Sequence, residues 1–455
     1  MHAQMSSIHA ILVSVSCLFV AVTLSAADCE RYYEEVHGSY PYIVILLKFK
    51  DISDEPQCSS PYTDCWDYFT ELFGTNYPGL DHYWRTVSYG HLNLEGTSVL
   101  PQWYTLPKDR SDYTDGEDDD LDLLAQDGAS VADADVDFRR YAGIAFILNG
   151  SLGANRGRRC EMTLDGETPR VWNVIFIKKN DYGADVVAHE IGHSLSMPWH
   201  SCEPSTNYGS RWDVVSEVAG KLPSDCQYQD SVFGCIPVHP IAYHKFKSGW
   251  IPSANRIEAP SGTTKVVTIE RLEQENPISG YIMATIPMGT HPNGYYTVEA
   301  RKRADAYEQD LPGEAILIHQ VDASSGIPYN TCDARVMDAD NNGDANDAGA
   351  MWLPGETYYD TANNVMISVL DEAGTGWQVG LSRSPRNPCY VDIGNTGTED
   401  GSAAHPFNTI LEGIAAVVPE RSILIKPGAY PERLKVRKPC RLERNGSAGT
   451  VIIGR

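Results

Sequence analysis

The chain has 455 residues and is 42% hydrophobic, which is enough for two or three domains with sizeable cores. Its formal net charge is −25, so we expect neither nucleic acid nor an anionic membrane surface as a partner. The same charge fits a secreted protein and is compatible with calcium binding.

The N-terminal segment has the character of a secretory signal. Residues 8–27 are nearly all apolar or small and end in small side chains suited to cleavage near Ala26 or Ala27. No Lys or Arg precedes this run, so an uncleaved membrane anchor is the alternative. We predict a signal peptide over residues 1–27 and a secreted product without membrane contact after cleavage.

Apolar runs alternate with helical spacing in the next part of the chain. Continuous apolar runs predict buried strands over residues 42–49, 144–148 and 174–177. Residues 64–97 predict two helices, closed by Gly74 and Gly90. Strands alternating with helices indicate an α/β layer structure. The acidic stretch from Asp112 to Asp137 is predicted to be a solvated loop, with a calcium site as the alternative.

Residues 189–193 read His-Glu-Ile-Gly-His, which predicts a metal-binding helix. Residues four apart share one face of a helix, so His189 and His193 can direct two imidazoles at one ion. Glu190 lies beside them, where it can take a proton from a metal-bound water. Apolar side chains at helical spacing would pack the helix inward, namely Val186, Val187, Ile191 and Leu195. Such a motif arises by chance in about one in fifty chains of this size, so two buried histidines without a ligand are the alternative.

A third histidine, His200, follows a Met-Pro pair that would end the helix and turn the chain back. Three protein ligands and one water form a catalytic zinc site, whereas a structural site has four protein ligands. Zinc on His189, His193 and His200 would lower the pKa of its water to about 7. Glu190 would act as general base and then pass the proton to the leaving amine.

The chain has eleven cysteines, of which Cys17 would leave with the signal peptide. The other ten are an even number, which suggests disulfides in an exported protein and leaves their connectivity open. Cys202 follows His200 by two residues, and a bridge to Cys226 or Cys235 would pin the loop of the third ligand. Cys202 as a zinc ligand is the alternative.

Two β-rich regions follow. From about residue 259, alternating apolar and polar side chains predict an antiparallel β domain, with strands over residues 265–272 and 314–322. From about residue 388, strands over 422–426, 434–437 and 451–453 are separated by Pro-Gly and Asn-Gly turns, which suggests stacked coils of a β-solenoid. About three repeats are needed for stability, so these coils would rest on the β domain or belong to a truncated product.

One segment of the β domain has the pattern of a calcium loop. Residues 338–347 carry acidic and amide side chains at every second position, with Gly343 at the turn, as in the first half of such a loop. The candidate ligands are Asp338, Asp340, Asn342 and Asp344. The twelfth position is Gly349 rather than a bidentate Glu, so Glu356 or Asp360 would have to close the shell. A hydrophilic turn without an ion is the alternative.

The His189 motif is accompanied by further stretches that share one resemblance. These are residues 42–51, 83–96, 103–107, 212–216, 243–252, 296–301 and 311–322. Together they resemble secreted metallopeptidases of the immune inhibitor A type, a metzincin-like group, over about residues 40–385. The resemblance implies a zinc endopeptidase with a metzincin-like catalytic domain. Residues 390–392, 406–410 and 426–430 separately resemble the opening of a pectin-lyase-like right-handed β-helix.

The sequence departs from that family at three points. The family has Gly where Ser196 stands, and Ser in a left-handed conformation would cost roughly 1 kcal/mol. The family's third ligand, His or Asp, falls on Trp199, so His200 comes one residue late and would be delivered by a different turn. The methionine beneath the family's metal is Val215 here. Because that methionine packs under the site without binding the ion, valine is expected to be tolerated.

The complete sequence predicts an α+β protein, with a metzincin-like α/β domain, an antiparallel β domain and a short solenoid-like tail. The predicted parts are a signal peptide (1–27), a zinc metallopeptidase domain (28–255), a β-sandwich-like domain (256–386) and a partial right-handed β-helix-like segment (387–455). The predicted function is hydrolysis of protein or peptide substrates by a secreted zinc endopeptidase.

Two other functions stay open at this point. A catalytically inactive, peptidase-like surface or adhesion protein would explain Ser196 and Trp199, and the tail suggests a glycan-binding or carbohydrate-active protein. Tyr208 is a candidate second electrophile in the site, with a surface aromatic as the alternative. His239 and His244 are expected to be structural, because a lone histidine rarely indicates a ligand.

Overall fold

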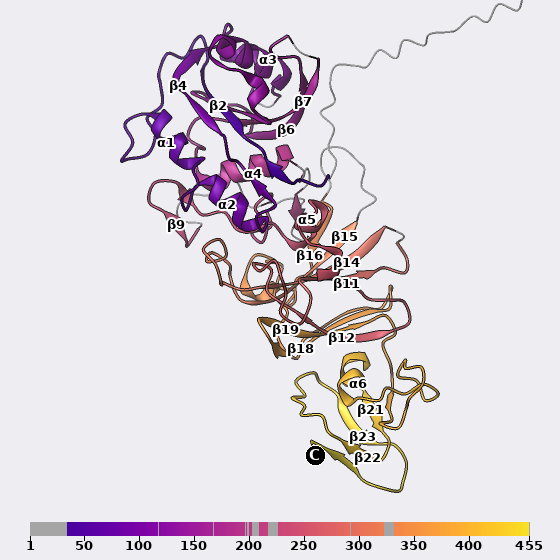
Figure 1. Cartoon of the computed structure of the whole chain (residues 1–455). Coiled ribbons are helices and arrows are strands. Elements are labelled where there is room, and N and C mark those ends of the chain that lie inside the picture. The colour runs from indigo at the N-terminus through magenta and orange to yellow at the C-terminus, as the bar shows by residue number, and fades with distance from the viewer. Residues whose placement is uncertain are drawn as a thin grey trace, which may run out of the picture.

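The computed structural model describes residues 34–454 except 117, 167, 196, 198–199, 203–208, 217–225, 292 and 323–331. The predicted signal peptide lies outside the described residues. Within the described part, no helix is long and apolar enough to cross a bilayer. The chain forms an elongated molecule in which an N-terminal α/β unit, a β-rich middle and a small β-rich tail follow one another (Figure 1).

The N-terminal α/β unit is built on a five-stranded sheet with the order β4-β2-β5-β7-β6. Its strands are β2 (Tyr42–Lys48), β4 (Ser98–Thr105), β5 (Gly143–Leu148), β6 (Arg156–Met162) and β7 (Arg170–Ile177). β2, β4, β5 and β7 are parallel, whereas β6 pairs antiparallel with β7 and forms one edge. The three apolar runs therefore form strands as predicted.

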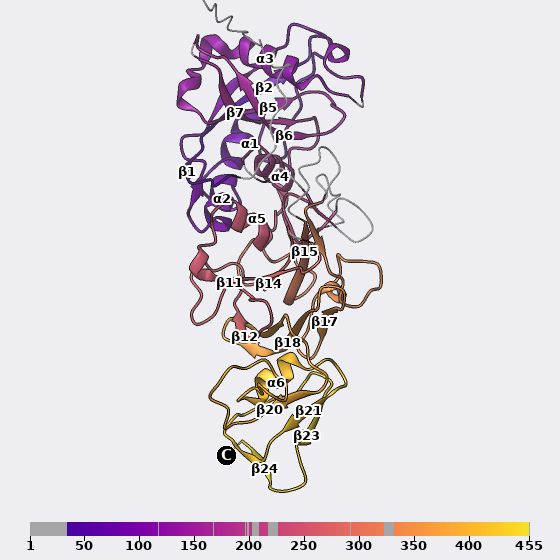
Figure 2. The same cartoon turned by 90° about the vertical axis from the view of Figure 1, so that its right-hand side faces the viewer.

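The central strands carry apolar side chains on both faces of the sheet, so helices cover both faces. Val44 and Leu46 of β2 pack toward α1 (Cys65–Leu72), α2 (Leu80–Val87) and α4 (Ala184–Leu195). Ile43 and Ile45 pack toward α3 (Leu121–Ala132) on the opposite face. Figure 2 shows α3 on one side of the sheet and the other three helices on the other side. The α/β layer structure is confirmed, as are the two helices expected before β4.

The acidic stretch was predicted to be a loop, and this prediction is wrong for its central part. α3 occupies residues 121–132, and its N-terminus is capped by Asp120, whose carboxylate accepts a hydrogen bond from the Leu123 N–H at 3.0 Å. Leu121, Leu124 and Ala125 are buried against the sheet. The acidic residues around them mask this apolar stripe in the sequence.

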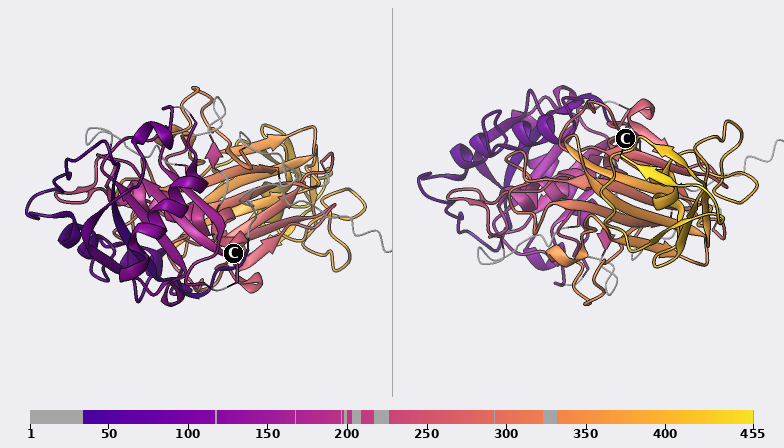
Figure 3. Two further views of the ribbon diagram at one scale, coloured as in Figure 1. Left: turned by 90° about the horizontal axis from the view of Figure 1, so that it is seen from above. Right: turned by 90° about the horizontal axis from the view of Figure 1, so that it is seen from below.

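The middle region, residues 256–382, contains two sheets that share one hydrophobic core. The first has the order β11-β13-β14-β15-β16-β8, and the second has the order β12-β19-β18-β17. Their strands are β11 (Arg256–Glu258), β12 (Thr264–Ile269), β13 (Met283–Pro287), β14 (Gly294–Arg301), β15 (Ala315–Asp322), β16 (Ala334–Val336), β17 (Thr357–Asp360), β18 (Val365–Ala373) and β19 (Gly376–Ser382). We call this region the β domain. Seen from above, the N-terminal unit lies to one side of its strands (Figure 3).

The β domain is mostly antiparallel, but the prediction of an antiparallel fold is wrong at both borders of its first sheet. β11 pairs parallel with β13, and β8 (Ser201–Cys202) pairs parallel with β16. β8 belongs in sequence to the predicted catalytic domain. Trp212, Ile241 and Tyr243 also come from that part of the chain and are buried in the core of the β domain. The two regions are therefore joined by a shared sheet and a shared core.

The tail consists of parallel strands and one helix. β20 (Cys389–Val391), β21 (Ser422–Ile425) and β23 (Arg441–Arg444) form one sheet, and β22 (Gly428–Tyr430) pairs with β24 (Val451–Ile453). The predicted strand over 434–437 is absent. Instead, Lys435 and Arg437 form ion pairs with Asp371 of β18, and Lys438 donates a hydrogen bond to Ser368 Oγ at 3.0 Å. This segment docks the tail onto the β domain, where α6 (Ile410–Ala416) also packs.

The remaining elements are short. They are β1 (Gly38–Ser39), β3 (Leu92–Asn93), β9 (Gln229–Asp230), β10 (Gly234–Cys235) and α5 (Ala242–Lys247). Single 3-10 turns occupy Arg110–Asp112, Asp133–Asp135, Phe138–Arg140, Ser253–Asn255 and Ala348–Ala350. α5 lies at the junction of the N-terminal unit and the β domain (Figure 2).

Candidate metal centre

Helix α4 carries two histidines that point to one place, with a glutamate between them in sequence. Its apolar side chains Val186, Val187, Ile191 and Leu195 are all buried in the core beneath the sheet, as predicted. This packing fixes the rotation of the helix about its axis, so His189 and His193 emerge on one face. Their ring centroids lie 4.5 Å apart.

Three imidazoles converge at this point. The Nε2 atom of His193 lies 3.0 Å from Nε2 of His189 and 3.1 Å from Nε2 of His200. The ligand atoms of all three lie within 4.8 Å of one another. Among the residues that the structure describes, this is the one group of three or more His, Cys, Asp or Glu side chains placed to hold a metal ion. The structure thus brings the three predicted ligands together.

Backbone carbonyls determine how two of the rings are protonated. Nδ1 of His189 lies 2.9 Å from the carbonyl oxygen of Val214, and Nδ1 of His193 lies 2.8 Å from that of Met197. A carbonyl only accepts hydrogen bonds, so each Nδ1 carries the proton and each Nε2 presents a lone pair. Two lone pairs 3.0 Å apart repel unless a cation lies between them, and histidine ligands of metals are oriented by such contacts.

The donor set fits a divalent ion such as zinc. Tetrahedral zinc with Zn–N bonds of about 2.0–2.1 Å separates its nitrogen ligands by about 3.3 Å. The two Nε2 distances are slightly shorter than this value, so small side-chain rotations would accommodate an ion. Neutral imidazole is the donor form, and burial lowers the pKa of His189 to about 4, which keeps that ring neutral.

Glu190 lies between His189 and His193 on α4 and has a buried, strongly perturbed carboxyl group. Burial raises the pKa of Glu190 to about 8, while the nearby Arg156 guanidinium and a hydrogen bond from the Gly157 N–H oppose part of the rise. Both of these residues belong to the edge strand β6. The predicted general base is therefore held between α4 and the edge strand of the sheet.

β6 can approach α4 this closely because residue 157 is glycine. A Cβ atom at position 157 would lie 1.9 Å from the carbonyl oxygen of Glu190 and 2.9 Å from Cβ of His193. Any larger residue would force strand and helix apart. The sequence reasoning missed β6, because an arginine-rich stretch shows no apolar alternation that would indicate a strand.

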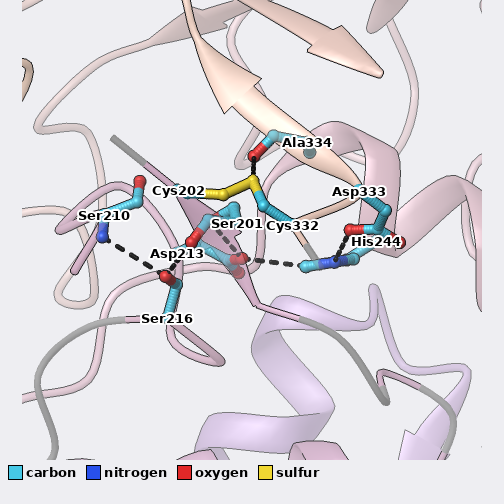
Figure 4. Close-up of a disulfide and its surroundings, with 9 residues drawn as sticks. All are labelled: Ser201, Cys202, Ser210, Asp213, Ser216, His244, Cys332, Asp333 and Ala334. Atoms are coloured by element: carbon cyan, nitrogen blue, oxygen red, sulfur yellow. Dashed lines mark hydrogen bonds and ion pairs between the residues drawn. A yellow bond between two sulfur atoms is a disulfide. The ribbon is translucent and has the colours of Figure 1, made fainter. Parts of the chain in front are cut away.

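The third histidine is held by contacts from outside α4. His200 precedes β8, which pairs with β16 through Ser201 and Ala334. Figure 4 shows the disulfide between Cys202 and Cys332 and the polar side chains around it. The predicted bridge from Cys202 to Cys226 or Cys235 is wrong, because those two cysteines bond to each other. A disulfide also excludes Cys202 as a zinc ligand.

The cysteines of the described residues form three disulfides in all. The third joins Cys58 to Cys65, while Cys160, Cys389 and Cys440 lie outside these three bridges. Cys29 lies outside the described residues, and the three bridges among the other nine cysteines agree with the expectation of disulfides.

The turn beneath the metal site packs against α4 through Val215. A Cβ atom on Gly192 of the helix would lie 2.4 Å from Cγ1 of Val215, so the valine fills the space below the helix. This is the position at which the resembled family has a methionine. Ser196, Trp199 and Tyr208 lie outside the described residues.

His239 and His244 are buried and lie outside the histidine cluster. His239 pairs with Asp305, with Nε2 and Oδ2 2.8 Å apart, and its Nδ1 lies 2.8 Å from Nζ of Lys245. His244 pairs with Asp213, with Nδ1 and Oδ2 2.9 Å apart. Both side chains take part in buried polar contacts between the N-terminal unit and the β domain.

In the predicted calcium loop, side-chain oxygens accept hydrogen bonds from backbone N–H groups of the same loop. Oδ1 of Asp340 accepts a hydrogen bond from the Asn342 N–H at 3.0 Å, and Oδ1 of Asn342 accepts one from the Asp344 N–H at 2.6 Å. Asp338 likewise accepts from the N–H of Gly343 at 3.3 Å. Among the described residues, these carboxylates do not form a group of three whose oxygens lie as close together as the histidine nitrogens, which lie within 4.8 Å of one another.

The two residues proposed to close the calcium shell have other partners. Glu356 accepts a hydrogen bond from the Leu353 N–H at 2.6 Å, and Asp360 accepts one from the Tyr296 hydroxyl at 2.7 Å. The end of the loop instead contacts the turn below the metal site. The Trp212 indole donates to the Ala345 carbonyl at 2.7 Å. The loop thus supports the segment that leads to Val214.

Comparison with known proteins does not assign the chain to a family. No family model matches the chain, and no curated protein is significantly similar to it in sequence. The site is therefore interpreted from the residues themselves.

Proposed function

We propose that this protein is a secreted zinc endopeptidase with a metzincin-like catalytic domain and a solenoid-like tail. The observation that carries the proposal is the convergence of three histidine Nε2 atoms at the helix that also carries the buried Glu190. Three protein ligands leave one coordination position for water or substrate, which is the arrangement of catalytic rather than structural zinc sites. The disulfides support export, because such bonds persist in oxidising compartments.

The residues around the cluster support hydrolysis of an acyl bond. Zinc bound there would supply Lewis-acid chemistry, polarising a carbonyl and making water more acidic. Glu190 would take the proton of the attacking water and deliver it to the leaving nitrogen. The Gly157 N–H and Arg156 keep this carboxyl group in place during both transfers.

The edge strand favours an extended peptide as the substrate. Among the described strands β6 pairs with β7 alone, so no further described strand covers its other side. An extended segment can add to such an edge as a further strand. Because Gly157 lies directly against Glu190, a peptide aligned with β6 would pass the glutamate and His193.

The test compares purified full-length variants for metal content and casein cleavage. We expect the wild-type protein to contain about one zinc ion and to cleave casein. His193→Ala should lose both properties. Glu190→Gln should keep the metal and lose activity by roughly 10²–10⁴-fold, the usual contribution of a general base. Glu71→Gln, an exposed change on α1 away from β6, is the control and should behave as wild type.

The proposal makes two outcomes decisive. If Glu190→Gln cleaves casein at the wild-type rate, Glu190 is not the general base. If the wild-type protein retains no divalent metal after purification in zinc-containing buffer, the hydrolase assignment is wrong.

A further inference from the structure

The position of the third metal ligand depends on residues far from α4 in sequence. His200 is followed directly by β8, a strand of only two residues, Ser201 and Cys202. A strand this short has little pairing energy of its own. It is fixed by its parallel pairing with β16 and by the bond from Cys202 to Cys332, which spans 130 residues of sequence. The β domain therefore holds the segment that carries His200.

Asp213 joins the segments that hold two different ligands. Its Oδ2 atom accepts a hydrogen bond from the Ser201 hydroxyl at 2.8 Å, next to His200. Its neighbour in sequence, Val214, provides the carbonyl that orients His189. The fully buried carboxylate of Asp213 is thus hydrogen-bonded to the strand that follows His200. It is also adjacent in sequence to Val214, whose carbonyl oxygen contacts His189.

The same carboxylate is tied to the β domain by His244. Nδ1 of His244 lies 2.9 Å from Oδ2 of Asp213, and its Nε2 lies 3.9 Å from Oδ1 of Asp333. Asp333 immediately follows Cys332 and precedes the first residue of β16. Figure 4 shows these side chains around the disulfide, with Asp213 between Ser201 and His244. Side-chain contacts thus connect β8 to Asp213, Asp213 to His244, and His244 to the residue before β16. The disulfide connects β8 to the same segment directly.

A second contact fixes β8 to the same turn. The Ser216 hydroxyl donates to the carbonyl of Ser201 and also accepts a hydrogen bond from the Ser210 N–H at 3.2 Å. Ser201, Ser210, Asp213 and Ser216 are all fully buried. Buried polar groups that satisfy one another specify a single arrangement, because breaking one contact leaves the partner unsatisfied.

We propose that Asp213 is a positioning residue for the metal centre and that the β domain, through Asp213, His244 and the Cys202–Cys332 bridge, sets the place of His200. The inference rests on the metal centre of the proposed function and extends it. Residues that orient metal ligands through one intermediate contact typically change metal affinity by 10–100-fold when substituted. The β domain is then part of the metal site.

A matched pair of variants separates positioning from general stability. His239–Asp305 is a second His–Asp pair with nearly the same distance, 2.8 Å, in which His239 is buried and Asp305 is half-buried, and it contacts neither a metal ligand nor β8. Asp213→Asn and Asp305→Asn each remove one charge from such a pair. Zinc affinity would be measured on the full-length proteins by competition with a chelating dye. The absorption spectrum of the cobalt-substituted proteins would report the ligand geometry.

We expect Asp213→Asn to bind zinc roughly 10–100-fold more weakly than wild type and to change the cobalt spectrum. Asp305→Asn should leave both measurements unchanged even where it lowers the melting temperature of the metal-free protein. Equal affinities and spectra in the two variants would overturn the inference. Absence of metal binding by the wild-type protein would instead reject the proposed function.

A disulfide pair provides the second test should Asp213→Asn not fold. Cys202→Ser with Cys332→Ser frees β8 from the β domain, whereas Cys226→Ser with Cys235→Ser removes a bridge of only nine residues' separation. The first double variant should show the weaker zinc binding and the altered cobalt spectrum, and the second should not. The reverse result would show that the β domain does not position His200.

Discussion

Replacement of Gly157 by alanine tests how closely β6 must approach the metal-binding helix. The new Cβ atom would lie 1.9 Å from the Glu190 carbonyl oxygen, whereas real Cβ contacts are essentially never below 3.0 Å. Strand or helix must therefore move by about 1.1 Å. Both atoms in conflict belong to backbone or to a Cβ position, so no side-chain rotation relieves the contact.

Two consequences follow from this displacement. Overpacking of this kind costs about 1–3 kcal/mol of stability, which exceeds the roughly 0.4–1 kcal/mol that alanine gains by restricting the unfolded chain. The movement also shifts Glu190 and His193 relative to His200. A misplacement of about 1 Å in a catalytic group can lower the rate by about 10²-fold. We expect a lower melting temperature and a decrease of kcat/KM for casein by about two orders of magnitude.

The assay measures zinc affinity, casein kcat/KM and the melting temperature of Gly157→Ala beside a control. Gly289→Ala is a suitable control, because the nearest atom to its new Cβ would be the Asn363 carbonyl oxygen at 3.8 Å, an ordinary contact. Wild-type values of affinity and kcat/KM for Gly157→Ala would refute the reasoning, since the close approach would then have no role at the site.

Three further predictions concern the metal, the helix packing and the tail. Removing the metal with a chelator should lower the melting temperature of wild type but not of His193→Ala, because an ion at 100 times its Kd stabilises the folded state by about 2.7 kcal/mol. Gly192→Ala should destabilise the protein, and Val215→Ala in the same chain should restore stability, because the two side chains compete for one space. Burial lowers the pKa of Lys438 to about 7 from 10.5, so the unfolded state binds more protons between these values. Stability should thus rise with pH across this window, and Lys438→Met should remove the rise and raise stability most below pH 7, as thermal melts at several pH values would show.

The sequence predicts those parts of the fold whose pattern is local. β2, β5 and β7 are buried on both faces, so each appears as an uninterrupted apolar run. The sequence does not predict α3, because the acidic side chains beside Leu121 and Leu124 dominate the composition of the segment. The sequence does not predict β6 for a different reason. This edge strand is held by its pairing with β7, so few of its side chains have to be apolar and buried.

The candidate site divides in the same way. His189, Glu190 and His193 are predictable because one helical turn fixes their relation, whatever the rest of the fold. His200 is predictable as a nearby donor, but the contacts that hold it are not. The partner of Cys202 lies 130 residues away, and the pairing of β8 with β16 involves too few residues to leave a pattern in either segment.

In the proposed zinc site, the location of the third ligand accounts for the core that the N-terminal unit and the β domain share. A helix places two ligands rigidly, but a third from a connecting segment has to be fixed elsewhere, since an unpinned loop loses conformational entropy when it binds an ion. Here the segment is fixed by a strand in the neighbouring sheet, and Trp212 of the turn is buried in the core of the β domain. The buried Arg301 of β14 also donates to the Trp212 carbonyl at 2.7 Å. Both supports of the turn beneath the histidines thus come from the β domain, and in the proposed site the positions of the histidines depend on the packing between the two regions.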